Sequence, residues 1–128
     1  FFASSSSYGF SDLKSFSQHT HKYELHYTTT LMGGTYEDLP GVYKARSALH
    51  HADKIRTPLL LLQGDQDRVV APDQSRRMAR AIESHAGKIK YIEFPSEGHG
   101  FRRSDTRQRA LEEAFAWCND AARIPEVC

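Results

Sequence analysis

The fold of this chain is decided by the stretch Thr57-Pro58-Leu59-Leu60-Leu61-Leu62-Gln63-Gly64-Asp65-Gln66-Asp67. Its four consecutive leucines show no polar alternation, which indicates a strand that is buried on both faces. Gly64 and the acidic residues behind it end the strand abruptly and place carboxylates just beyond its carboxyl end. A strand of this kind belongs to the interior of a sheet that is covered by helices on both sides.

A second strand and two helices follow in regular alternation. The run Lys90-Tyr91-Ile92-Glu93-Phe94 predicts a strand over residues 88–94, and Gly98-His99-Gly100 comes shortly after it. Pro72-Asp73 opens the intervening helix, and Gly87 is expected to stop it. The last helix is predicted over residues 104–123, with an inner stripe of Ala110, Leu111, Ala114, Phe115 and Cys118. The order strand, helix, strand, helix predicts a parallel sheet with right-handed crossovers.

The first half of the chain adds one more strand and several short helices. A short strand is expected within residues 1–7, and helices are expected near residues 11–17, 20–33 and 38–49. The second of these helices would be capped by Thr20 and would carry Tyr23, Tyr27, Leu31 and Met32. Three short strands can hardly shield the leucine strand at both edges. We therefore interpret residues 1–128 as the C-terminal half of an α/β domain, a mostly parallel sheet flanked by helices, whose N-terminal part lies outside this chain.

Composition excludes some classes of partner. The 128 residues are 39% hydrophobic and carry a formal net charge of +1, so charge makes no case for nucleic acid or an anionic membrane. The longest aliphatic run is four leucines, far short of a membrane span of about 20 residues. Cys118 and Cys128 are too few for a disulfide scaffold. The chain begins at Phe1 without a visible signal peptide, which we interpret as a truncation; the compartment stays open, with the cytoplasm slightly favoured.

Asp67 and His99 are the candidate catalytic residues. They lie 32 residues apart (99 − 67), which is enough for one helix and one strand, so both are expected at the same edge of the sheet. A histidine with an ordinary pKa near 6.5 can take and return a proton at neutral pH. A carboxylate bonded to its Nδ1–H would hold the right tautomer, and the chain order agrees with Ser…Asp…His. Asp65 is expected to fix the loop by bonding its backbone amides.

The chain offers no convincing nucleophile. Gly9-Phe10-Ser11-Asp12-Leu13 comes nearest to Gly-x-Ser-x-Gly, but a leucine replaces the last glycine, so Ser11 is interpreted as structural. An Asp-x-Asp metal site at Asp65 and Asp67 is the weaker alternative, because no further acidic cluster supports it. No metal and no cofactor are therefore expected, and the basic pair Arg102-Arg103 is interpreted as solvated. Five further histidines show no i, i+4 pairing with a nearby acid of the kind that zinc sites use, so surface and packing roles are expected for His19, His21, His26, His50 and His51.

Several motifs together resemble the C-terminal catalytic region of the prolyl oligopeptidase family, in its acylaminoacyl-peptidase and dipeptidyl-aminopeptidase-like branch. The likeness covers nearly the whole chain. It is carried by Tyr8-Gly9-Phe10-Ser11-Asp12-Leu13, Thr20-His21-Lys22-Tyr23-Glu24, Ala48-Leu49-His50-His51-Ala52-Asp53-Lys54-Ile55, Thr57 to Val70 with Pro72, and Glu97-Gly98-His99-Gly100-Phe101. Ala71 departs from the family, which often has proline there.

The resemblance implies an α/β-hydrolase fold and a serine peptidase that acts on peptide substrates. It implies the acid role for Asp67 and the base role for His99, with the nucleophile elbow shortly before Phe1. The fragment alone is then expected to be inactive. Family members often carry an N-terminal β-propeller, of which this sequence shows nothing. A carboxylesterase on the same fold, or a non-catalytic module that dimerises through an open sheet edge, stays open as an alternative, and we expect a homo-oligomer or association with the absent N-terminal part.

Overall fold

A small parallel sheet forms the centre of the computed structural model, which describes residues 1–19 and 25–122. The strand order is β1-β2-β3, and Leu61 of the central strand pairs with Ser6 on one side and Tyr91 on the other. The elements of the sheet layer are β1 (Ser4–Ser7), β2 (Leu59–Gly64) and β3 (Ile89–Phe94), with the helices α4 (Asp73–Ser84) and α5 (Ser104–Ala122). The predicted alternation and parallel pairing are confirmed.

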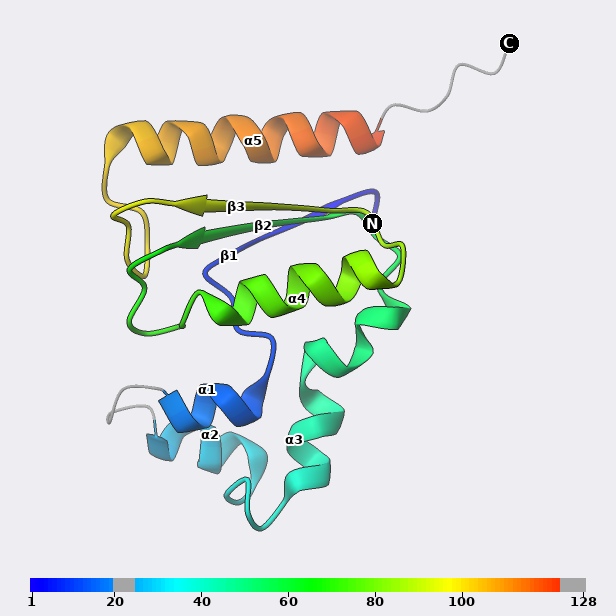
Figure 1. Ribbon diagram of the computed structural model, residues 1–128, viewed down its shortest axis with the longest axis vertical. Helices are drawn as coiled ribbons and strands as arrows, with labels where there is room; N and C mark the ends of the chain where they lie inside the picture. The colour runs from blue at the N-terminus through cyan, green and yellow to red at the C-terminus, as the bar shows by residue number, and fades with distance from the viewer. Residues whose placement is uncertain (20–24, 123–128) are drawn as a thin grey trace.

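Helices cover both faces of the sheet, as the leucine run predicted (Figure 1). Leu60 and Leu62 face α5, where they pack with Ala110, whereas Leu61 faces α4 and packs with Ile82. These three leucines are at most 6% exposed. Successive strand residues point to opposite faces, so a run of leucines supplies apolar contacts to two layers at once.

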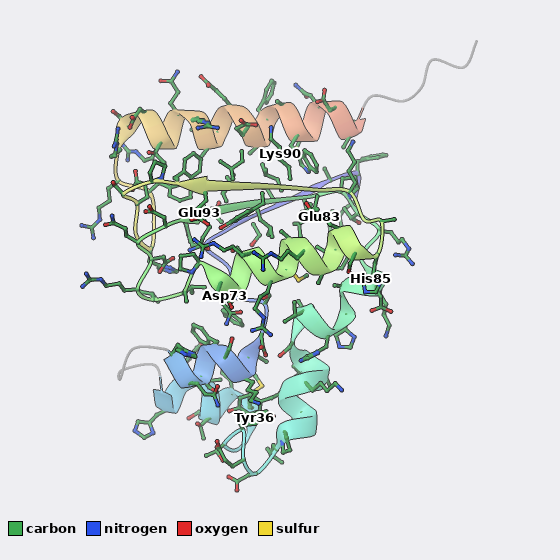
Figure 2. All side chains as sticks on the ribbon, viewed as in Figure 1. Tyr36, Asp73, Glu83, His85, Lys90 and Glu93 are labelled. Atoms are coloured by element: carbon green, nitrogen blue, oxygen red, sulfur yellow. The ribbon has the colours of Figure 1, made fainter. Side chains whose placement is uncertain are left out.

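The side chains of β3 show the same alternation (Figure 2). Lys90 faces α5 and forms an ion pair with Glu113 of that helix. Glu93 faces α4 and forms a bidentate ion pair with Arg76. These ion pairs lie at the more exposed strand, so they join each helix to the sheet without placing a charge in the core.

The helices before β2 are shorter than expected. They are α1 (Leu13–His19), α2 (Leu25–Met32), α3 (Pro40–Arg46) and the 3-10 segment η1 (Ala48–Lys54). The single helix expected over residues 38–49 is wrong, because Ser47 has an extended backbone and separates α3 from η1. The buried Ser47 hydroxyl donates to the Tyr43 carbonyl and accepts the Leu13 amide at the start of α1. Thr20 and Tyr23 of the expected second helix lie outside the described residues.

The sheet-facing stripe of α5 also differs from the prediction. Thr106 and Ala110 are the buried residues of this helix, and Trp117 continues the same face with its indole N–H 3.4 Å from the Pro58 carbonyl. The expected stripe members Leu111, Phe115 and Cys118 are exposed, Leu111 by 72% and Phe115 by 70%. Small side chains at the contact let the helix axis approach the sheet closely, and the larger ones point aside.

Within the part of the chain that the structure describes, none of the helices combines the length and the apolar character that crossing a lipid bilayer requires.

Candidate active site at the carboxyl ends of the strands

Two loops leave the sheet at the same edge, one after β2 and one after β3 (Figure 1). Their backbones are joined by a hydrogen bond from the Gln66 amide to the Glu97 carbonyl, 2.9 Å long. The approach is so close that a Cβ on Gly64 would lie 2.3 Å from that carbonyl oxygen. Only glycine fits at the end of β2, since a side chain there would push the two loops apart.

Asp67 is the best-fixed residue of the site. Its Oδ1 accepts the amides of Val69 and Val70 at 2.9 and 2.8 Å, and its Oδ2 lies 2.9 Å from Nδ1 of His99. The side chain is fully buried. The two amides hold the carboxylate in one orientation, so the oxygen that faces His99 cannot rotate away.

A buried amide behind Asp67 completes its set of partners. Gln63 donates from Nε2 to Oδ2 of Asp67 at 3.0 Å, and its own Oε1 accepts the hydroxyl of Ser75 on α4. Gln63 is fully buried, and the sequence reasoning missed it. A polar residue directly after four leucines was the available signal, because a buried amide needs partners of its own.

His99 lies in a looser environment than its acid. Its side chain is 38% exposed, and its ring contacts the Tyr8 ring edge-on at 5.1 Å between centroids. Gly100 has a φ of +90°, so the turn after the imidazole uses the left-handed region that glycine tolerates. With Nδ1 bonded to Asp67, the imidazole presents Nε2 as the nitrogen available to a reacting group.

Glu97 holds the loop of His99 from behind, and the sequence reasoning assigned it no role. Its carboxylate is 2% exposed and accepts the backbone amides of Arg102 and Arg103 at 2.9 and 3.1 Å, just before α5 begins. The pKa of Glu97 is lowered, mainly by the Arg102 amide, with a further hydrogen bond from Thr106. The carboxylate thus caps the start of α5 and fixes both ends of the His99 turn.

An apolar cavity of about 460 Å³ opens beside the imidazole. Tyr27 and Leu31 of α2 belong to its wall, which explains why two large apolar residues of that helix are 63% and 54% exposed. Its lining includes Phe10, Phe16, Tyr27, Leu31, Val69 and His99. Such a cavity can take a bulky apolar side chain next to a group undergoing proton transfer.

The other candidate residues are placed away from this pair. Asp65 accepts the Ser96 amide at 2.7 Å, so it fixes the neighbouring loop rather than the amides of its own turn. Ser11 is buried and donates to the Gln74 carbonyl at 2.8 Å, a structural role as interpreted from the sequence. Among residues 1–19 and 25–122, no group of three or more His, Cys, Asp or Glu side chains is arranged to hold a metal ion.

Curated relatives include peptidases and an esterase. The chain is 38% identical over 72 residues to dipeptidyl aminopeptidase BIII of Pseudoxanthomonas mexicana, which is 55% of this chain and 10% of that protein. It is 32% identical over 88 residues to esterase LipQ of Mycobacterium tuberculosis, which is 67% of this chain and 21% of that protein. The chain therefore spans only a tenth to a fifth of the length of these relatives.

Solved structures and a family match agree with one another. A puromycin-hydrolyzing peptidase of Mycobacterium tuberculosis superposes with a TM-score of 0.88 at 38% identity, covering 95% of this chain and 19% of that one. Pyrococcus horikoshii acylaminoacyl peptidase superposes at 0.77 with 21% identity and supports the α/β-hydrolase fold alone. Residues 1–124 match the prolyl oligopeptidase family. This chain belongs to the prolyl oligopeptidase family and has an α/β-hydrolase fold.

Proposed function

We propose that this chain supplies the acid and the base of a serine-type acyl hydrolase that cleaves peptide bonds. The observation that carries the proposal is the Asp67–His99 contact, 2.9 Å between Oδ2 and Nδ1, with the carboxylate locked by two backbone amides. Membership in a peptidase family supports it. The nucleophilic serine and the oxyanion hole would come from polypeptide outside these 128 residues, as part of the same catalytic domain.

The proposed reaction is a two-step acyl transfer. Nε2 of His99 takes the proton of the serine hydroxyl while the oxygen attacks the carbonyl carbon, and the negative charge develops on the carbonyl oxygen. His99 then gives that proton to the leaving nitrogen as the C–N bond breaks. Water repeats the sequence on the acyl-enzyme and releases the acid. Asp67 stays ionised throughout and stabilises the imidazolium that forms twice in each cycle.

The apolar cavity supports a preference on the acyl side of the bond. Its volume of about 460 Å³ and its aromatic lining suit a large apolar or aromatic side chain. The puromycin-hydrolyzing peptidase, which is 38% identical, supports amide bonds as the substrate class. We therefore expect peptides with phenylalanine, tyrosine or leucine before the scissile bond to be cleaved faster than those with glycine or aspartate.

An esterase is the second candidate. The similarity to esterase LipQ over two thirds of this chain favours it, and the same acid and base serve ester cleavage. The two candidates differ in the leaving group, because an amine needs a proton from the imidazole and an alkoxide leaves more easily. Matched amide and ester substrates with the same acyl group distinguish them.

The test uses the polypeptide encoded by the complete reading frame that contains this chain. We expect Gly-x-Ser-x-Gly upstream of Phe1 and labelling of that serine by a fluorophosphonate, with hydrolysis of a phenylalanyl amide. His99→Gln should abolish both labelling and turnover, whereas His85→Gln, on the exposed end of α4, should leave both intact.

Three outcomes would count against the proposal. A reading frame that starts near Phe1 with no upstream serine motif would favour the non-catalytic module instead. Full activity in the His99→Gln protein would remove the imidazole from the mechanism. Ester cleavage without amide cleavage would select the esterase.

A further inference from the structure

A second hollow adjoins the imidazole. It is an open groove of about 650 Å³, and Val69 and His99 belong to its wall as well as to the wall of the apolar cavity. Its lining includes Arg68, Ser96, Gly98, His99, Arg102 and Arg103. The imidazole therefore belongs both to the wall of an apolar cavity and to the wall of a groove whose lining includes three arginines.

The three arginines of this groove are not equivalent. Arg103 forms a bidentate ion pair with Asp105, so its charge already has a partner. Neither Arg68 nor Arg102 has an ion pair within residues 1–19 and 25–122. Two exposed arginines whose guanidinium groups have no ion-pair partner among the described residues thus belong to the wall of a space that reaches His99.

The negative charges close to the groove do not neutralise these two arginines. Glu97 is buried and uses its carboxylate on the backbone amides of Arg102 and Arg103, not on their side chains. Asp65 accepts the Ser96 amide of the neighbouring loop. Among the residues that line the groove, three are arginines and one, Glu97, is acidic, so basic side chains predominate on its wall, although the sequence alone favoured a solvated role for the Arg102-Arg103 pair.

We infer that this groove binds the terminal carboxylate of the leaving peptide, so that the enzyme prefers substrates with a short free C-terminal segment. The inference rests on the proposed function, because it takes the apolar cavity as the site of the acyl side chain. His99 gives its proton to the leaving nitrogen, so the leaving group lies against the imidazole. With the acyl side chain in the apolar cavity, the leaving segment extends into the basic groove.

The reach of the arginines limits the length of the leaving segment. An extended residue spans about 3.3–3.6 Å, so the carboxylate of a one- or two-residue leaving group ends about 4–7 Å beyond the scissile nitrogen. A guanidinium on the wall of this groove can bind a carboxylate that lies within it through two parallel hydrogen bonds. Longer segments carry their carboxylate past the groove.

The experiment compares free acids with amides on the complete enzyme. Substrates of the form acetyl-Phe-Ala, acetyl-Phe-Ala-Ala and acetyl-Phe-Ala-Ala-Ala-Ala are assayed with a free C-terminus and as C-terminal amides. We expect kcat/KM to be about two- to fivefold higher for the acid than for the amide with one- and two-residue leaving groups, and equal for the four-residue one. The preference should shrink in 0.5 M salt, since the groove is open to solvent.

Arginine variants locate the effect. The double substitution Arg68→Gln and Arg102→Gln should bring the acid-to-amide ratio to about one. Glutamine at position 102 keeps the backbone amide that Glu97 binds, so the loop geometry is preserved. Arg80→Gln, at an exposed position of α4 outside the groove, removes the same charge and should leave the ratio unchanged.

The results separate this inference from the proposed function. If the native enzyme cleaves both substrates with an acid-to-amide ratio near one, the groove does not bind the terminal carboxylate. The proposed hydrolase function would still stand in that case. A preference for a carboxylate on the acyl side, measured with succinyl-Phe amides, would also overturn binding of the terminal carboxylate in the groove. If no substrate is cleaved, the proposed function fails, and binding to the groove is measured instead. Ala-Ala should then shift the His99 imidazole NMR signals at a lower concentration than Ala-Ala amide. Equal shifts with the two dipeptides would refute carboxylate binding in the groove.

Discussion

The loop of Asp67 and the loop of His99 reach the same point by different means. The acid is fully buried and held by bonds from within its own loop and from Gln63, whereas the imidazole is 38% exposed and bonded to the acid. Within the second loop Glu97 accepts the amides of Arg102 and Arg103, and the Gln66 amide of the first loop donates to the Glu97 carbonyl. The comparison shows that both loops have internal bonds to a carboxylate, while the catalytic side chains differ: the Asp67 carboxylate is held by its own loop and by Gln63, and the His99 imidazole is held by the acid.

The sharpest test of this difference is Asp67→Asn. The two amides at the Oδ1 position keep the carbonyl oxygen of asparagine there, which turns its NH₂ group toward His99 and leaves Nε2 of Gln63 without its bond to this side chain. Nδ1 must then accept, so Nε2 carries the proton and cannot act as a base. We expect turnover by the complete enzyme to fall about 10⁴-fold, and nitrogen NMR of this chain to show the switched tautomer.

Asp65→Asn is the matched control for that substitution. It keeps an oxygen for the Ser96 amide, so the tautomer and the turnover should stay close to those of the native protein. An unchanged rate in the Asp67→Asn enzyme would show that the imidazole works without its acid.

Gly64→Ala breaks the contact between the two loops. A methyl group would lie 2.3 Å from the Glu97 carbonyl oxygen, so the loops must separate. We expect a loss of about 1–3 kcal/mol in the free energy of unfolding by urea, together with loss of the Asp67–His99 hydrogen bond. In the Gly41→Ala protein the new methyl group on α3 meets no atom within 4 Å, so this substitution should not destabilise the protein. An equal loss of unfolding free energy in the two variants would show that the contact at Gly64 does not hold the loops together.

Glu97→Gln should disturb the base loop and leave the acid loop intact. Its amide group would place an N–H against the amide of Arg102 or Arg103, at a cost of about 1.5–3 kcal/mol at pH 7. Because the pKa of Glu97 is lowered in the folded protein, its stabilising effect is present at neutral pH. That effect is lost as the pH falls below about 4.3, the usual glutamate value.

Urea unfolding between pH 7 and pH 3 checks this expectation. The native chain should lose more stability over that range than the Glu97→Gln chain. Glu83→Gln, near the exposed end of α4 (Figure 2), should show the same pH dependence as the native chain. Parallel curves for the native and Glu97→Gln chains would remove Glu97 from the cap of α5.

The smallest effect is expected behind the acid, at Ser75→Ala. Gln63 loses the hydroxyl that its Oε1 accepts but keeps its bond to Asp67, so about 1 kcal/mol of stability should be lost. The His99 tautomer should not change in nitrogen NMR. Ser84→Ala, an exposed serine of the same helix, should be nearly neutral. A tautomer change in Ser75→Ala would show that the internal order of the acid loop depends on α4.

The sequence predicted the features that local pattern controls. The leucine run predicted β2, and the 32-residue spacing between Asp67 and His99 left room for one helix and one strand, β3. Because the carboxyl ends of parallel strands lie at the same edge of a sheet, the contact between Asp67 and His99 followed from this topology. The break at Ser47 did not follow, because the hydroxyl bonds α1, a partner distant in sequence. Residue patterns alone do not show which helix a buried serine will join.

Close packing between elements is the second feature that the sequence pattern did not predict. Leu111 and Phe115 lie one position after Ala110 and Ala114, so the apolar pattern of α5 fits either face, and only contact with the sheet selects the small residues. Gly87 was expected to stop α4, and the helix does end just before it, but the left-handed residue at this end is Ala86. Gly87 is needed because a Cβ there would lie 2.4 Å from the Ile82 side chain.

Trp117 offers an optical probe of one layer of this molecule. It is the single tryptophan of the chain, it lies on the sheet-facing side of α5, and the Lys88 ammonium stands 5.4 Å from its ring centroid. Detachment of α5 would expose the indole to water and change its emission without any added label. Fluorescence should therefore report the docking of this helix, while NMR of His99 reports the loops, so the two events can be timed separately in a single refolding experiment.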